Sequence, residues 1–201
     1  MPTLHLLRHL PAAEANGRAI GHTDLPLADP DAPDRLAQAW PHEPPARLVA
    51  SPLLRAARTA RALGAKWNLD INFEPRLREM DFGTWDGRTW DEIERDDAAA
   101  LHAWMGDWTA TPAPGGESFA DVQARVGAWL SELVDDAAAQ DTAAQDAATV
   151  VVVAHAGSIR AVLVQVLGLD PAQAFRLDVH HGALTTVRLK PPCLTVLNRP
   201  L

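Results

Sequence analysis

The chain has 201 residues, a formal net charge of −8, and a hydrophobic fraction of 47%. These values suit one globular domain, residues 1–201, and the negative charge disfavours nucleic acid or an anionic membrane as a partner. We expect neither a membrane span, which needs about 20 apolar residues, nor a signal peptide. The single cysteine excludes an internal disulfide and favours a cytoplasmic location.

The first half of the chain alternates short apolar runs with helical patterns. Ser51 is a candidate N-cap and Pro52 a candidate first helical residue, so a helix is expected directly after the second strand. The elements predicted here are a strand at 3–7, a long loop at 10–33, a short helix at 32–40, a strand at 47–50, a helix from 52 to about 65, a strand at 70–73 and a loop at 75–88.

The second half contains the strongest predicted strand, residues 149–154, which read Thr-Val-Val-Val-Val-Ala. Residues 135–148 are low in complexity and are interpreted as a frayed helix end and a surface loop. The other predicted elements are helices at 90–108, 117–133 and 158–167 and strands at 174–179, 183–189 and 193–197. Strands alternating with helices predict a three-layer α/β/α sandwich with a mainly parallel central sheet.

Basic side chains follow three of the predicted strands. Arg8 and His9 end the first strand, Arg55 lies in the first turn after the second, and His155 ends the valine-rich strand. Ligands of open parallel sheets bind outside the carboxyl ends of the strands, where helix starts also favour anions. Each side chain alone has an ordinary structural explanation, but together they predict a pocket for a tetrahedral dianion.

Six motifs carry a resemblance to a known family. They are Leu6-Leu7-Arg8-His9, Gly21-His22-Thr23-Asp24, Ser51-Pro52-Leu53-Leu54-Arg55, Leu77-Arg78-Glu79-Met80-Asp81-Phe82-Gly83, Pro114-Gly115-Gly116-Glu117-Ser118-Phe119 and Val153-Ala154-His155-Ala156-Gly157. From residue 4 to about 200 the sequence resembles the phosphoglycerate mutase-like histidine phosphatase superfamily. The fourth and fifth motifs are similar to those of its alpha-ribazole phosphatases.

The resemblance implies a role for particular residues. His9 would be the nucleophile that forms a phosphohistidine, with Arg8, Arg55 and His155 around the phosphoryl oxygens. Glu79 would be the general acid. The residues alone leave Glu74, Asp81 and Asp86 as alternatives to it. Four further residues would lie near phosphate or substrate, namely Asn16, Gly21, His22 and Ala156. No metal or cofactor is implied.

The sequence departs from the family pattern at three positions. Leu10 and Ala156 stand where the family usually has glycine after each histidine, and Asn16 is about one residue out of register. Trp85 is the best candidate for an exposed ring that stacks on a nucleobase. His180 and His181 resemble half a metal site that nothing completes, and they are interpreted as ordinary strand-end histidines.

The sequence therefore predicts a phosphomonoesterase that acts on a small phosphorylated metabolite. The expected substrate is alpha-ribazole 5′-phosphate, in cobalamin nucleotide-loop synthesis. One alternative is a broad-specificity or sugar-phosphate phosphatase of the same superfamily. Another, suggested by Leu10, is a non-catalytic phosphate-binding pseudo-enzyme. The short chain disfavours a phosphoglycerate mutase, and the oligomeric state is not predicted.

Overall fold

A computed structural model describes residues 3–139 and 149–201. Its six strands form one sheet in the order β3-β2-β4-β1-β5-β6. β1, β2, β3 and β4 are parallel, whereas β5 runs antiparallel to β1 and β6 runs antiparallel to β5, which confirms the mainly parallel sheet. The strands are β1 (Thr3–Arg8), β2 (Arg47–Ala50), β3 (Ile71–Phe73), β4 (Thr149–Ala154), β5 (Ala183–Leu189) and β6 (Pro192–Pro200).

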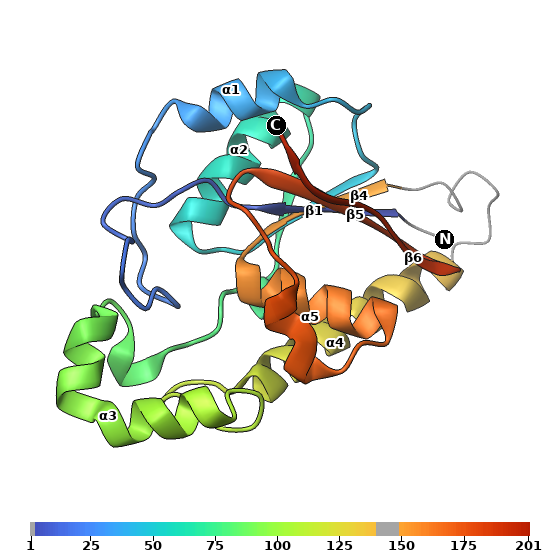
Figure 1. Cartoon of the computed structure of the whole chain (residues 1–201). Helices are drawn as coiled ribbons and strands as arrows, with labels where there is room; N and C mark the ends of the chain where they lie inside the picture. The colour runs from blue at the N-terminus through green and yellow to red at the C-terminus, as the bar shows by residue number, and fades with distance from the viewer. Residues whose placement is uncertain (1–2, 140–148) are drawn as a thin grey trace.

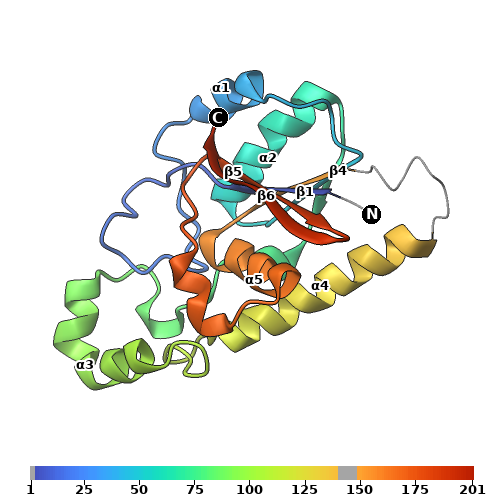
Figure 2. The ribbon, with the colours of Figure 1, turned by 45° about the vertical axis from the view of Figure 1, so that its right-hand side comes forward.

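Helices cover both faces of this sheet, as Figures 1 and 2 show. α1 (Ala32–Ala39) and α2 (Leu54–Trp67) lie on one face, and α4 (Phe119–Ala139) and α5 (Ala156–Leu167) lie on the other. α3 (Trp90–Gly106) stands away from the sheet in both views. The predicted three-layer architecture is confirmed.

The valine run of β4 explains why both layers form. Successive side chains of a strand point to opposite faces. Val150 and Val152 therefore pack into the core cluster shared with α4 and α5, whereas Val151 and Val153 pack into the cluster shared with α1 and α2. Burying apolar side chains on both faces fixes this strand at the centre of the sheet.

Strand register brings the basic side chains to one edge. Arg8 of β1 pairs with Ala154 of β4, and Ala50 of β2 pairs with Val153. The ladder continues one residue further, because His9 N donates to Ala154 O at 3.0 Å. The residues that follow these strands therefore emerge side by side.

Three helix starts and one strand differ from the prediction. α4 begins at Phe119, later than the predicted residue 117. α2 begins at Leu54 with Leu53 as its N-cap, so Ser51 is not the cap. α5 begins at Ala156 with His155 as its N-cap, earlier than predicted. The predicted strand at 174–179 is wrong: Pro171–Arg176 form a 3₁₀ helix, since Asp170 caps its first turn by accepting from Ala172 N.

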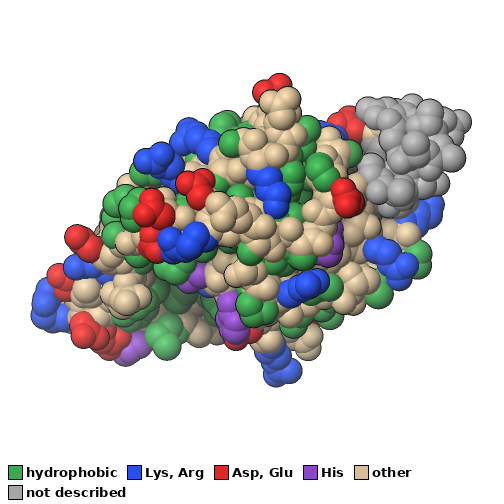
Figure 3. All heavy atoms as spheres, turned by 90° about the horizontal axis from the view of Figure 1, so that it is seen from above, with side chains coloured by type: hydrophobic (Ala, Val, Ile, Leu, Met, Phe, Trp, Pro, Cys, Tyr) green, Lys and Arg blue, Asp and Glu red, His purple; other side chains and the backbone are tan. Residues whose placement is uncertain are grey.

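The low-complexity segment is partly helical. α4 continues to Ala139, and the rest of the interpreted loop, 140–148, lies outside the described residues. Within the described ranges, no helix is long and apolar enough to cross a membrane. Acidic and basic side chains are interspersed over the face shown in Figure 3.

Candidate active site

His9 sits directly after β1 with its side chain almost fully buried (5% exposed). Its Nδ1 lies 2.6 Å from the carbonyl oxygen of Leu10. Because a carbonyl oxygen only accepts, Nδ1 carries the proton and Nε2 keeps its lone pair. Burial lowers the pKa of His9 well below its usual value, and the Arg55 and His181 charges lower it further. The ring is therefore neutral near pH 7, as a nitrogen nucleophile must be.

Arg55 is held beside that nucleophile by the main chain. Its Nη1 donates to Thr23 O at 2.9 Å and its Nη2 donates to Gly21 O at 2.6 Å. These bonds hold Nε in place, and Nε donates to His9 Nε2 at 3.3 Å. The side chain is 1% exposed, so its positive charge acts at the nucleophile with little screening by water. Gly21, predicted near the phosphate, contributes its carbonyl oxygen to this arrangement.

Arg8 and His155 are the other two side chains predicted around the phosphate; Arg8 lines the cavity at His9, whereas His155 does not. Arg8 Nη1 donates to Val179 O at 2.6 Å, while its buried Nε has no hydrogen-bond partner among the described residues. His155 is fully buried, with Nε2 2.8 Å from Ser51 Oγ and its ring centroid 4.9 Å from that of His9. Ser51 thus orients a histidine instead of capping a helix. Burial lowers the pKa of His155 well below its usual value.

Glu79 lies in the loop at 75–88 and lines the same cavity as Arg8, His9 and Arg55. Its Oε1 accepts from Met80 N and from Gly157 N, each at 2.9 Å. A Cβ at Gly157 would lie 2.2 Å from Oε1, so a larger residue there displaces the carboxylate. No local sequence pattern predicts this role of Gly157, because the close approach joins segments far apart in the chain.

The main chain of Glu79 is fixed as firmly as its carboxylate. Its carbonyl oxygen accepts from His22 Nε2 and from Arg125 Nη2, each at 3.0 Å. Arg125 also pairs with Glu117, whose other oxygen accepts from Asp81 N. His22, predicted near the substrate, therefore helps to fix the main chain of Glu79 through its hydrogen bond to the carbonyl oxygen.

The other three carboxylates have structural partners outside the cavity. Glu74 pairs with Arg76 and caps the turn that follows it. Asp86 accepts from the backbone N–H groups of Gly21, His22 and Thr23. Asp81 accepts from Gly83 N, and its Oδ2 lies 3.3 Å from His22 Nδ1. Among these four carboxylates, Glu79 alone lines the cavity at His9.

That cavity has a volume of about 230 Å³ and two unlike ends. The polar end is formed by Arg8, His9, Arg55 and Glu79. The outer end has one wall of small and aliphatic residues and one aromatic wall, with Asn16 and Arg18 exposed at the rim. The two walls consist of Ala12, Ala15, Ala19 and Ile20, and of Phe82 and Trp90. Ala156 lies beside the polar end, at the start of α5.

The aromatic wall is not formed by the tryptophan that the sequence favoured. Trp85 is fully buried and its Nε1 donates to Asp97, so the prediction of an exposed Trp85 is wrong. Trp90 lines the cavity instead, with its ring 5.8 Å from that of Phe82. Sequence alone could not separate the two, since both lie in or beside the same loop.

His181 also lines the cavity, which the strand-end interpretation missed. β5 runs antiparallel to β1, so the residues before β5 meet the residues after β1. Gly182 N accordingly donates to Arg8 O at 3.0 Å, and His181 Nδ1 lies 3.0 Å from His9 O. The strand directions are the signal that would have placed this histidine at the site.

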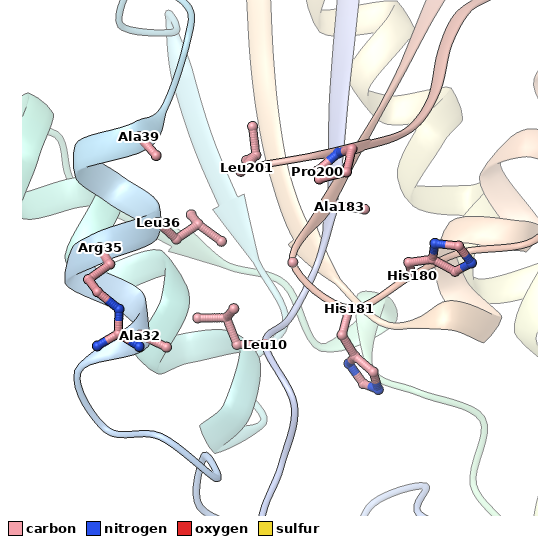
Figure 4. A pocket seen from close by; sticks show the side chains of 11 residues that line it. Leu10, Ala32, Arg35, Leu36, Ala39, His180, His181, Ala183, Pro200 and Leu201 are labelled. Carbon is pink, nitrogen blue, oxygen red and sulfur yellow. The ribbon is translucent and has the colours of Figure 1, made fainter.

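Leu10 does not obstruct the site. Its side chain lines a second cavity of about 490 Å³, between α1 and the β5–β6 edge, and does not line the cavity at His9. Figure 4 shows Leu10 and Leu36 on the α1 side of this second cavity, opposite Ala183 and Leu201. The residue that replaces the usual glycine is therefore accommodated behind the nucleophile.

No group of three or more His, Cys, Asp or Glu side chains within 3–139 and 149–201 is arranged to hold a metal ion.

Comparisons with known proteins agree with this geometry. Residues 4–198 match the model of the histidine phosphatase superfamily (branch 1). The glucosyl-3-phosphoglycerate phosphatase of Mycobacterium tuberculosis is 39% identical over 64% of this chain, a match that spans 57% of that relative. The adenosylcobalamin/alpha-ribazole phosphatase of Salmonella typhimurium is 28% identical over 92% of this chain and 89% of its own length.

Solved structures show the same two kinds of relative. An alpha-ribazole phosphatase from Shigella flexneri superposes with a TM-score of 0.85 at 25% identity, covering 98% of this chain and 96% of that one. A mycobacterial glucosyl-3-phosphoglycerate phosphatase superposes with a TM-score of 0.84 at 31% identity, covering 99% of both chains. Since the family model spans nearly the whole sequence, the chain belongs to the histidine phosphatase superfamily.

Proposed function

We propose that the protein is a phosphomonoesterase that transfers a phosphoryl group from a small ester to His9 Nε2. The observation that carries this proposal is the fixed tautomer of His9. Its Nδ1–H is committed to Leu10 O, so Nε2 carries the lone pair, which accepts a long hydrogen bond of 3.3 Å from Arg55 Nε in a cavity that also holds Arg8 and Glu79. Relatives named as phosphatases support the same activity.

In the first step, Nε2 attacks phosphorus as the bond from phosphorus to the ester oxygen breaks. Protonated Glu79 gives its proton to the leaving oxygen, so an alcohol departs. In the second step, the Glu79 carboxylate takes a proton from water as that water attacks phosphorus. Phosphate leaves, His9 is restored and Glu79 is protonated again.

The charge of the transferring group is balanced by the side chains around it. Arg55 Nε lies beside the nucleophile, and the buried, unpartnered Nε of Arg8 is a donor free for a phosphoryl oxygen. Preorganised donors in a dry site stabilise a transition state more than donors in water do. A charged residue of this kind contributes about 10³–10⁵ in rate in other phosphoryl-transfer enzymes. These side chains supply the charge that a metal ion supplies elsewhere.

For the substrate, we propose alpha-ribazole 5′-phosphate, which would place the protein in cobalamin nucleotide-loop synthesis. The aromatic residues Phe82 and Trp90, which line the cavity together with small side chains, suit a flat ring system. The alpha-ribazole phosphatases among the relatives support the same choice. A sugar-phosphate ester is the second candidate, because glucosyl-3-phosphoglycerate phosphatases are more similar in sequence. The single cysteine supports a cytoplasmic location.

Two measurements test this proposal. Hydrolysis of p-nitrophenyl phosphate should proceed and should be unaffected by EDTA. A lack of turnover would favour a binding protein, and inhibition by EDTA would contradict a metal-free mechanism.

The second measurement compares kcat/KM for alpha-ribazole 5′-phosphate, glucosyl-3-phosphoglycerate and 3-phosphoglycerate. We expect the first to be highest, and an equal or lower value would remove the substrate assignment.

A further inference from the structure

His181 is the one cavity-lining histidine that the proposed mechanism does not use. Its ring centroid lies 4.9 Å from that of His9, the same distance that separates the rings of His9 and His155. Figure 4 shows its ring extending from the loop on the side away from Ala183 and Leu201. Two imidazoles thus lie close to the nucleophile.

The loop that carries His181 is anchored on both sides. Arg8 Nη1 donates to Val179 O, and Gly182 N donates back to Arg8 O. Further out, Asn198 Nδ2 donates to Asp178 O and Asn198 Oδ1 accepts from His180 N. The position of the ring is therefore set by the protein before any ligand arrives.

The hydrogen bonding of the ring fixes its tautomer. Nδ1 lies 3.0 Å from His9 O, which only accepts, so Nδ1 carries the proton. Nε2 has no hydrogen-bond partner within the described parts of the chain. In the neutral ring Nε2 is an acceptor, and it becomes a donor when the ring gains a proton.

A fully ionised phosphate or sulfate offers only acceptor oxygens. It can bond to Nε2 of His181 only if the ring is protonated there. We propose that His181 is a further anion-binding side chain beside Arg8 and Arg55, one that takes up a proton when a dianion binds and donates it from Nε2 as a hydrogen bond. This inference rests on the function proposed above and adds to it a residue that couples anion binding to proton uptake.

The charges around His181 favour this behaviour. It shares the cavity with Arg8 and His9 at the end of β1, Arg55 on α2, Glu79 and the exposed Arg18, and it shares the second cavity with Arg35 on α1. Asp178 and His180 lie in its own loop. Partial burial lowers the pKa of His181, and the Arg8 and Arg55 charges lower it further. The ring is therefore neutral in the empty site. A bound dianion offsets the two arginine charges, which favours protonation.

The experiment uses His181→Asn, because the asparagine amide can replace Nδ1–H but offers nothing at the position of Nε2. Sulfate is the probe, since it stays a dianion from pH 6 to 9 and any pH dependence then arises in the protein. Inhibition of p-nitrophenyl phosphate hydrolysis gives its affinity. Calorimetry in two buffers of different ionisation enthalpy gives the number of protons taken up on binding.

We expect His181→Asn to bind sulfate roughly 10- to 100-fold more weakly at pH 7, as loss of a charge-assisted hydrogen bond implies. We also expect it to take up close to one proton fewer than the wild type at the pH where wild-type uptake is largest. His180→Asn is the matched control. His180 is exposed, pairs with Asp178 and does not line the cavity, so its variant should behave like the wild type.

Wild-type sulfate affinity and proton uptake in His181→Asn would overturn the inference and leave His181 a purely structural residue. If the variant unfolds, ¹⁵N NMR of the wild-type imidazoles provides the test: His181 should change from the Nδ1–H form to the doubly protonated form on adding sulfate. An unchanged tautomer would overturn the inference equally. Turnover by the wild type and its loss in His9→Asn test the proposed function separately.

Discussion

The two ends of the catalytic cavity are built by different means. At the phosphate end, His9 and His155 directly follow neighbouring parallel strands, and each is at most 5% exposed. At the outer end, Asn16 and Arg18 belong to a long loop tied down by two isolated bridges and are exposed. In the proposed function, the sheet thus positions the reacting groups, while loops shape the space for the leaving group. Changes at the phosphate end should affect every substrate, whereas changes at the outer end should alter the choice among substrates.

The largest effect is expected from His9→Asn at the phosphate end. The amide can still donate to Leu10 O, but the nucleophilic nitrogen is gone. We expect kcat to fall at least about a thousandfold for every phosphate ester tested. Steady-state kinetics with alpha-ribazole 5′-phosphate and p-nitrophenyl phosphate measures this, and thermal unfolding checks that the fold is kept. A variant that loses activity on one of these esters but retains it on the other would contradict the division between the two ends of the cavity.

Gly157→Ala should have the next largest effect. The new Cβ would meet Glu79 Oε1 at 2.2 Å, so the carboxylate must move away from the leaving oxygen. We expect kcat to fall by about 10²–10⁴, the range for loss of a general acid, with a much smaller change in sulfate inhibition. Glu79→Gln should show the same pattern.

Gly106→Ala is the matched control for this substitution. A Cβ there meets nothing within 4 Å, so both kcat and sulfate inhibition should stay at wild-type values. Equal kinetics for Gly157→Ala and Gly106→Ala would show that the contact with Glu79 has no part in turnover.

Trp90→Leu tests the outer end, because leucine removes the ring but keeps an apolar side chain. We expect kcat/KM for alpha-ribazole 5′-phosphate to fall about tenfold, since an aromatic pair contributes about 0.5–1.5 kcal/mol beyond its buried area. For glycerol phosphate, which has no ring, kcat/KM should stay nearly constant. Phe73→Ala removes an exposed aromatic side chain that does not line the cavity and is the control. Equal losses on both substrates would contradict a stacking role for Trp90.

The same division explains what the sequence could predict. Arg8, His9, Arg55 and His155 were placed correctly at one edge, because parallel strands align their carboxyl ends whatever the loops do. The exposed platform was assigned to Trp85 although Trp90 lines the cavity. That outcome depends on how the residues around 10–20 pack against 82–90, a contact with no local pattern.

Two further residues show which information was lacking. Ser51 had good N-cap chemistry, but its hydroxyl lies beside the buried ring of His155, a contact between segments more than a hundred residues apart. His181 needed the direction of β5, since an antiparallel strand brings its first residues to the active-site edge and a parallel strand does not. Local propensity finds elements, whereas these placements come from tertiary pairing.

The smallest effect concerns the histidine within β1, His5, which does not line the cavity at His9. It is 8% exposed, with Nδ1 2.8 Å from Thr186 Oγ1 and its ring stacked on His42. Burial lowers the pKa of His5 to about 4, and the charge of His42 contributes to the shift. The folded state therefore binds fewer protons here than the unfolded chain, in which the pKa is about 6.5.

The stability that His5 contributes is consequently full above pH 6.5 and is lost as the pH falls toward 4. We expect a loss of about 2 kcal/mol in the free energy of unfolding from this residue, after allowance for solvent screening. His5→Asn keeps a donor near Thr186 without a titrating ring, so urea unfolding between pH 7.5 and 4.5 should show a shallower pH dependence. His9 and His155 titrate in both proteins, so the difference between them isolates His5. If the unfolding free energies of the two proteins changed equally with pH, burial of His5 would not contribute to the pH dependence of stability. The loss of stability at low pH would then come from other groups, such as His9 and His155.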